Sequence, residues 1–260
     1  MEISILGSGS GGNSTFINID GIKILVDAGF SGKKLEEKLN NIGESLENIQ
    51  GILITHEHTD HIQGAGIVSR KYNIPLYITK ESFFAGQKKL GKISEENLNF
   101  IDTLEFFIND KIKVQPFDVM HDAERTVGFR IEEISSKKVL GISTDIGYID
   151  NRVREFFRGV NIMIIESNYD YQMLMECNYP WDLKDRVKSR NGHLSNNDAA
   201  KFVCENYSSN LKKVYLAHIS KDSNNFNIVS NTIISEMNRR NISIPIEITT
   251  QDTVTKLYKL

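Results

Sequence analysis

Three of the six histidines in this chain fall within one short segment, and an aspartate stands among them. The segment reads Thr55-His56-Glu57-His58-Thr59-Asp60-His61, and it follows an apolar run over residues 51–55 that is typical of a short buried strand. Imidazole nitrogens and carboxylate oxygens are the ligands that Zn²⁺ and Mn²⁺ take at neutral pH. In a loop after a strand, His56 and His58 can point to one ion, while Asp60 and His61 point to a second. The spacing therefore predicts a dinuclear metal site of the kind that hydrolases use.

A segment this short cannot complete the coordination of two ions, so further ligands must come from distant parts of the chain. Three ligand-type residues stand directly after strand-like apolar runs: His121, Asp145 and His218. Each is weak support alone, because single histidines and aspartates are usually ordinary surface or core residues. Strand ends that meet at one rim of a sheet sandwich would bring all three to the cluster, so we predict that they complete the site.

The elements that must position these residues alternate between strand and helix along the chain. Asp20-Gly21 between two β-type runs predicts a hairpin. Strands are predicted over residues 3–6, 51–55, 74–78, 112–117, 127–131, 139–142, 160–165 and 214–217, and helices over residues 32–40, 61–72, 81–88, 196–207 and 226–239. The two halves of the pattern each open with β structure, which favours two packed sheets with helices outside. We therefore predict an α/β sandwich that forms one domain over residues 1–260.

Composition and charge limit the class of protein. The net charge of −3 means that any nucleic-acid binding must come from a local basic face. Cys177 and Cys204 are the only cysteines, too few for a disulfide framework or a Cys-rich zinc site, which indicates a cytoplasmic protein with reduced thiols. We expect no signal peptide and no membrane span, since the chain has no basic N-terminal region before an apolar run and no long apolar stretch. Nothing in the pattern sets the oligomeric state.

The candidate residues resemble the metallo-β-lactamase superfamily in type and order. The matching elements are Asp27 after a hairpin strand, the cluster at residues 56–61, His121, Asp145 and His218. This resemblance covers essentially the whole chain and implies an αββα sandwich with the metals at one edge. It implies that His56, His58 and His121 hold the first ion, that Asp60, His61 and His218 hold the second, and that Asp145 bridges both. Asp27 matches a position that supports the ligands without binding metal itself.

Further motifs resemble the YycJ/WalJ-type subgroup, whose members are similar to 5′-to-3′ DNA exonucleases. These motifs are Ser8-Gly9-Ser10-Gly11-Gly12-Asn13-Ser14, Ser143-Thr144-Asp145, Glu166-Ser167-Asn168-Tyr169-Asp170, Gly192-His193-Leu194-Ser195-Asn196 and Leu216-Ala217-His218-Ile219-Ser220-Lys221-Asp222. The longer RNA-processing relatives insert a second domain between the bridging aspartate and the final histidine, and the segment between Asp145 and His218 is too short to contain it. The subgroup implies a metal-dependent phosphodiesterase that acts on DNA ends.

The motif around His193 favours a phosphodiester substrate. It adds a sixth histidine that the metal ligands do not need, and nucleases of the superfamily use a similar Gly-His motif to place a histidine near the scissile phosphate. Glu166 follows a buried strand and could orient His193, although a glutamate at a strand end is often simply exposed. Ser195 could contact substrate, and a loop that ends in a helix cap is the competing interpretation.

Two more features could contact phosphate. Lys184, Arg186, Lys188 and Arg190 alternate just upstream of His193 and would suit backbone phosphates, while a solvated helix face explains them as well. Ser10 and Asn13 belong to a Gly/Ser/Asn loop whose backbone N–H groups could bind an anion, and a plain tight turn explains that loop nearly as well.

The predicted mechanism places a hydroxide between two divalent ions, Mn²⁺ or Zn²⁺, from which it attacks phosphorus in line. Asp60 could orient the hydroxide, and His193 could donate a proton to the leaving oxygen or hold the phosphate. Two other classes stay open. One is a small-molecule hydrolase that acts on a cyclic phosphodiester, a thioester or a lactone. The other is a metal-stabilised binding module, which requires closed coordination and is disfavoured by ligands that come from loops.

Overall fold

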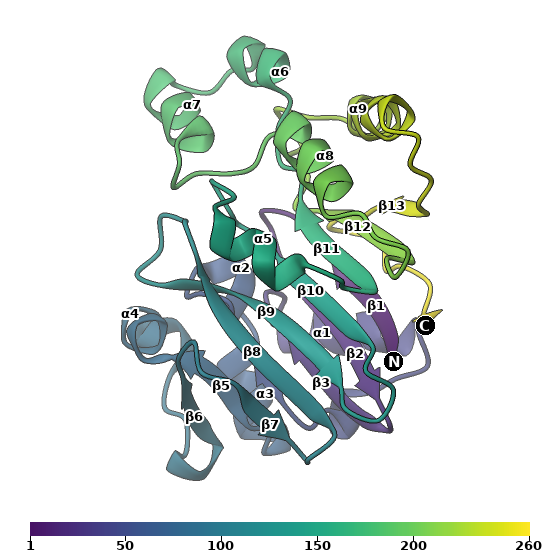
Figure 1. The fold of residues 1–260 in the computed structure, drawn as a ribbon. Coiled ribbons are helices and arrows are strands. Elements are labelled where there is room, and N and C mark those ends of the chain that lie inside the picture. Colours follow the sequence, from purple (N-terminus) through teal and green to yellow (C-terminus); the bar gives the residue numbers. More distant parts are fainter.

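The computed structural model describes residues 1–260 and contains two seven-stranded sheets that pack face to face, with helices on both outer sides (Figure 1). The first sheet contains β1 (Glu2–Gly7), β2 (Ser14–Ile19), β3 (Ile22–Val26), β4 (Ile52–Leu53), β5 (Leu76–Thr79), β6 (Leu98–Ile101) and β14 (Tyr258–Lys259). The second contains β7 (Phe106–Ile108), β8 (Ile112–Val119), β9 (Thr126–Glu133), β10 (Val139–Ser143), β11 (Ile162–Glu166), β12 (Lys213–Ala217) and β13 (Ile246–Ile248). The helices are α1 (Gly32–Asn40), α2 (Thr59–Ile62), α3 (Ala65–Tyr72), α4 (Lys80–Leu90), α5 (Asn151–Phe157), α6 (Tyr171–Glu176), α7 (Trp181–Lys188), α8 (Asn196–Glu205) and α9 (Phe226–Arg239).

Each sheet changes from antiparallel to parallel pairing across its width. In the first sheet, β1, β2 and β3 pair antiparallel, and β3, β4, β5 and β6 pair parallel. In the second, β7 to β10 pair antiparallel, and β10 to β13 pair parallel. Parallel neighbours end at the same edge, so the residues after β3 and β4 lie together, as do those after β10, β11 and β12. This topology gathers the residues at the strand ends.

The apolar residues divide into a central core between the sheets and an outer core on each side. Neighbouring residues of one strand belong to different cores: Ile17 of β2 packs between the sheets, while Phe16 packs against the helices. The same alternation separates Ile24 from Leu25 in β3. Strands covered on both faces are apolar throughout, and this explains the continuous apolar runs in the sequence. The predicted αββα sandwich is confirmed.

The hairpin over Asp20-Gly21 is also confirmed, with positive φ angles of 50° and 84° that suit a tight two-residue turn. The prediction of one helix over residues 61–72 is wrong, because two helices, α2 and α3, occupy this stretch. The backbone N–H of Gly64 donates to the carbonyl of Ala28 at 2.8 Å instead of continuing the helix. This hydrogen bond joins residues that are far apart in sequence, so the local pattern of apolar residues could not predict it.

The helices α5, α6 and α7 were not predicted. α6 and α7 protrude beyond the sheets near the end of β11 (Figure 1), and a small core of Tyr169, Leu174 and Val187 holds them. Trp181 in this segment is exposed, so the apolar stretch over residues 169–181 is only partly core. None of the helices is both long enough and apolar enough to span a lipid bilayer.

Candidate metal centre

Most of the predicted metal ligands lie on loops at the strand ends, whereas Asp60 and His61 lie in α2. Three residues on these loops have unusual backbone angles. Asp27, Asp145 and His218 follow β3, β10 and β12 with φ angles of 61°, 54° and 55°. Side chains other than glycine rarely adopt this left-handed conformation, which costs on the order of 1–3 kcal/mol at each position. The surrounding fold must compensate for this cost, and the three strained residues all lie in the candidate site.

The first group contains His56, His58 and His121, whose ligand atoms lie within 4.8 Å of one another. Nδ1 of His121 donates to the carbonyl of Gly192 at 3.0 Å, so its Nε2 carries a lone pair. That Nε2 faces Nδ1 of His58 at 3.3 Å. Two ligands of a tetrahedral zinc are separated by about 3.3 Å when the Zn–N bonds are about 2.0 Å, so this spacing fits a shared cation.

The second group contains Asp60, His61, Asp145 and His218, also within 4.8 Å of one another. Nε2 of His61 lies 3.0 Å from Oδ2 of Asp145 and 3.4 Å from Oδ2 of Asp60. Nε2 of His218 lies 3.7 Å from the same Asp60 oxygen. The other Asp145 oxygen, Oδ1, lies 3.7 Å from Nε2 of His121, so this carboxylate stands between the two groups.

Several ligand-type atoms are buried without a hydrogen-bond partner. These are Nε2 of His56, Nε2 of His218 and Oδ2 of Asp145. A buried polar atom without a partner is costly and needs a reason. Nitrogen and carboxylate donors that converge without satisfying one another fit divalent cations such as Zn²⁺ or Mn²⁺. The cluster is therefore suited to metal binding by its own chemistry.

Buried carboxylates orient the rings of two of these histidines. Nδ1 of His61 donates to Asp27 at 2.8 Å, and Nδ1 of His218 donates to Glu166 at 2.7 Å. Such a bond fixes the tautomer and directs the second ring nitrogen, Nε2, toward the cluster. Asp27 is itself held by the N–H and hydroxyl groups of Thr55. Asp27 therefore links Thr55 to the ring of His61.

The protonation of the cluster follows from burial and from mutual charge. Burial alone would raise the pKa of Asp145, but His218 and His61 beside it hold that pKa well below its ordinary value. Burial holds the pKa of His56 well below its ordinary value, and the nearby histidines lower it further. Burial would lower the pKa of His61 and His218, but Asp145 and the other carboxylates nearby raise both well above the ordinary value. A metal ion that binds these two histidines must therefore displace their protons, since neutral imidazole is the form that binds metal.

His193 lies next to both groups and forms a third group of ligand-type atoms with Asp145, Glu166 and His218, also within 4.8 Å of one another. Its Nδ1 donates to Oε1 of Glu166 at 2.8 Å, and its ring centroid lies 5.2 Å from those of His121 and His218. Oε2 of Glu166 accepts from the backbone N–H groups of Ile146 and Leu194. Burial would lower the pKa of His193, but the Glu166 carboxylate raises it above its ordinary value.

The four basic residues near His193 do not form one surface. Lys184 is buried and its Nζ donates to the carbonyl of Met175 at 2.6 Å, so the predicted substrate contact at Lys184 is not supported. Arg186 pairs with Asp122, and Lys188 pairs with Asp185. Arg190 is exposed and its guanidinium carbon lies 4.1 Å from the ring centroid of Tyr148.

Two predicted substrate contacts have structural roles instead. Ser195 is the N-cap of α8 and exchanges hydrogen bonds with Asp198, as the competing interpretation proposed. Asn13 is buried and its Nδ2 donates to Oδ2 of Asp60 at 3.1 Å. Ser10 is exposed on the same loop. Of the glycine-rich loop, the buried asparagine supports the cluster, and Ser10 and Gly11 are open to solvent.

Sequence reasoning missed two residues that support the site. The hydroxyl of Ser8 donates to Asn13 at 3.0 Å and accepts from the backbone N–H of His218 at 2.9 Å. It thereby ties the first loop to the loop after β12. Gly192 supplies the carbonyl that orients His121. Ser8 and Gly192 both stand in motifs that the sequence analysis named. The role of Gly192 could not be predicted from its residue type, because every residue has a backbone carbonyl.

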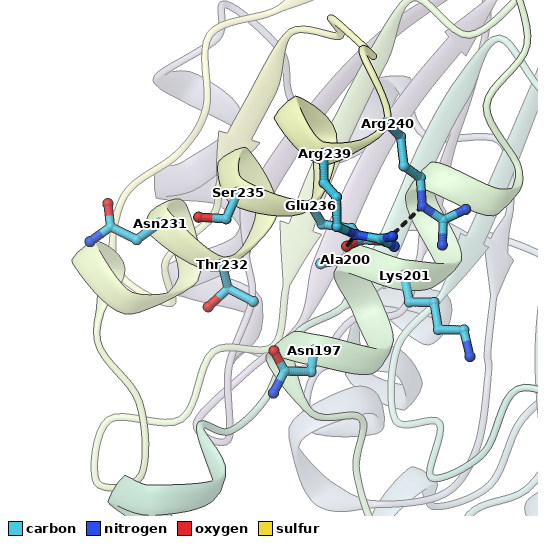
Figure 2. Close-up of a pocket in the computed structure, with 9 residues that line it drawn as sticks. All are labelled: Asn197, Ala200, Lys201, Asn231, Thr232, Ser235, Glu236, Arg239 and Arg240. Atoms are coloured by element: carbon cyan, nitrogen blue, oxygen red, sulfur yellow. Dashed lines mark hydrogen bonds and ion pairs between the residues drawn. The ribbon is translucent and has the colours of Figure 1, made fainter.

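One surface hollow lies away from the histidine cluster. It is an open groove of about 700 Å³ between α8 and α9 (Figure 2). Figure 2 shows Arg239 and Arg240 paired with Glu236 at one end of this groove. No residue of the metal clusters lines it. This groove therefore lies outside the candidate metal centre.

The two-layered sandwich and the His/Asp cluster at its edge define a metallo-hydrolase. Residues 23–219 match the family described as the β-lactamase superfamily domain, and the chain belongs to that superfamily, with the metallo-β-lactamase fold. It is 36% identical to exodeoxyribonuclease YycJ of Bacillus anthracis over 224 residues, which are 86% of this chain and 84% of that protein. It is 34% identical to exodeoxyribonuclease WalJ of Streptococcus pneumoniae, over 100% of this chain and 98% of that one. The metallo-β-lactamase fold protein YhfI of Bacillus subtilis superposes with a TM-score of 0.71 at 15% identity, over 98% of both chains.

Replacing Gly192 with alanine is expected to destabilise the site. A Cβ there would lie 2.1 Å from the carbonyl oxygen of Arg186 and 2.3 Å from that of Val187, so the loop must move. Overpacking of this kind costs about 1–3 kcal/mol, and the shift also removes the acceptor that orients His121. Thermal unfolding and metal content measure both effects. Gly32→Ala is the matched control, since its Cβ would meet only ordinary contacts of 3.6 Å or more; equal losses in both variants would contradict the argument.

Proposed function

We propose that this protein is a dinuclear metal-dependent exonuclease that degrades DNA from 5′ ends. The observation that carries the proposal is His193, which Glu166 holds beside both proposed ligand groups and which neither of these two groups includes. We assign this additional imidazole the role of proton donor to the leaving oxygen of a phosphodiester. The resemblance in sequence to proteins named exodeoxyribonuclease supports the same substrate.

The proposed metal ligands follow the two groups. His56, His58 and His121 would hold one ion, Asp60, His61 and His218 would hold the other, and Asp145 would contribute to both groups. Bound divalent ions supply a hydroxide nucleophile at neutral pH and offset charge on the phosphoryl oxygens. Either Mn²⁺ or Zn²⁺ suits this mixture of imidazole and carboxylate.

The chain's own groups position the substrate and move the protons. Asn13 fixes the Asp60 carboxylate, which orients the attacking water. Nε2 of His193 donates a proton to the leaving oxygen, and Glu166 favours the protonated imidazole that this step requires. The exposed guanidinium of Arg190 attracts backbone phosphates without regard to sequence, whereas Asp122 offsets the charge of Arg186.

Removal of the metal is expected to abolish the activity. Chelation empties the site, and readdition of Mn²⁺ or Zn²⁺ restores hydrolysis when two ions per chain have bound, because neither ligand group alone can both activate water and bind the phosphate. Metal analysis alongside rate measurement checks the stoichiometry. Full activity with a single ion per chain would contradict the dinuclear mechanism.

Defined DNA ends test the proposed substrate. Duplexes with a 5′ phosphate, labelled at either terminus, are incubated with the metal-loaded protein. Release of mononucleotides from the 5′ end is expected, with the 3′ label retained until late. Cyclic phosphodiesters, thioesters and lactones are assayed in parallel. If one of these small molecules is hydrolysed while the DNA remains intact, the protein is a small-molecule hydrolase and the exonuclease proposal is wrong.

A further inference from the structure

Three loops that carry predicted site residues also carry larger side chains at their surface. Met120 directly precedes His121, Tyr148 lies three residues after Asp145, and Arg190 lies three residues before His193. Met120 and Tyr148 are 39% and 42% exposed, and Arg190 is exposed as well. Each of these residues stands within three positions of a proposed site residue in the sequence, and neither Tyr148 nor Met120 has a part in the metal ligation or the proton transfer proposed above.

The backbone holds these loops against one another. Tyr148 and Met120 form an antiparallel bridge, and the N–H of Gly147 donates to the carbonyl of Met120 at 2.8 Å. A Cβ at Gly147 would lie 2.4 Å from the carbonyl oxygen of Arg190 and 2.6 Å from the nitrogen of Gly192. Only glycine permits this close approach. The Tyr148 ring is therefore presented from a fixed backbone.

Arg190 differs from its basic neighbours in having no acidic partner. Arg186 and Lys188 form ion pairs with aspartates, and the ammonium of Lys184 is bound inside the fold. No carboxylate lies within ion-pair distance of the Arg190 guanidinium, which instead stacks on Tyr148. An exposed aromatic ring and an unpaired guanidinium are two surfaces on which nucleobases stack.

We propose that Tyr148 and Arg190, here called the stacking pair, hold a nucleobase adjacent to the phosphate that is cleaved. This inference rests on the proposed function and names the group that the site recognises beside the phosphate. Every nucleobase has a π face, so such contact is tolerant of sequence. A DNA end is the source of that base, and the positive charge of Arg190 favours the phosphate attached to it.

Equilibrium binding tests the stacking pair without depending on turnover. The complete probe is a short 5′-phosphorylated, single-stranded thymidine oligonucleotide with non-hydrolysable linkages. The abasic probe is the same oligonucleotide without the bases near its 5′ end. The metal-loaded protein is expected to bind the complete probe about tenfold or more tightly than the abasic probe. Tyr148→Leu removes that difference and leaves metal content unchanged, whereas Tyr148→Phe preserves it. Tyr207→Leu is the matched control, since Tyr207 is 43% exposed after the end of α8.

The outcomes separate this inference from the proposed function. Equal binding of the two probes by the unmodified protein overturns the stacking pair, even where DNA is hydrolysed. If Tyr207→Leu reduces the difference in affinity between the two probes as much as Tyr148→Leu does, the stacking pair is also overturned. A base-dependent difference that Tyr148→Leu abolishes supports the pair even where hydrolysis from the 5′ end fails. If a free cyclic mononucleotide binds more tightly than the oligonucleotide, the proposal that the base comes from a DNA end is overturned.

Discussion

Asp145→Asn is expected to lose tight binding of at least one ion and nearly all hydrolysis. The two carboxylate oxygens face different ligand groups, at 3.7 Å from His121 Nε2 and 3.0 Å from His61 Nε2. A neutral amide cannot supply the negative charge that both cations require. Changing residues that merely orient metal ligands costs about 10–100-fold in metal affinity, so a shared ligand should cost more than about a hundredfold.

The choice of asparagine separates metal binding from backbone strain. Asparagine tolerates the left-handed backbone that position 145 adopts, whereas alanine would add strain of its own. Asp110→Asn is a matched control, because Asp110 has nearly the same φ, 53°, and belongs to no ligand group. Metal titration by calorimetry and hydrolysis of 5′-phosphorylated DNA are measured on both variants. Two tightly bound ions in Asp145→Asn would show that Asp145 does not hold both.

His193→Ala is expected to slow DNA hydrolysis by about 10²–10⁴-fold while both ions remain bound. This is the range that general acid catalysis contributes, and His193 belongs to neither of the two ligand groups proposed to hold the ions. Because Glu166 raises the pKa of His193, the protonated form persists above its ordinary pKa and is lost as pH rises further. The unmodified protein should therefore lose kcat as pH rises through that raised pKa.

The pH profile distinguishes an acid from a structural residue. In His193→Ala the loss of kcat at high pH disappears, because no proton remains to be lost from position 193. Glu166→Gln provides a contrast, since Glu166 also accepts from Nδ1 of His218 and its loss should reduce both kcat and metal affinity. An unchanged rate in His193→Ala with full metal occupancy would remove His193 from the mechanism.

Local patterns predicted much of the fold because each depends on residues that are near in sequence. The turn at Asp20-Gly21 and the apolar runs of the central strands both depend on short-range geometry. The prediction failed where a distant partner decided the outcome. Gly64 bonds to Ala28 and divides one predicted helix into two, and Lys184 turns inward to the Met175 carbonyl. Such contacts are invisible in a window of neighbouring residues.

The sequence by itself determined the types and order of the site residues, because the candidate ligands stand at or shortly after apolar runs that are typical of buried strands. Tertiary structure decided what each residue does. It directed the Asp27 carboxylate to His61, assigned Asn13 to Asp60, and joined His193 and His218 through one shared Glu166. The physical reason is that these roles depend on bonds of about 3 Å between loops far apart in the chain. Only the packing of the two sheets brings those loops together.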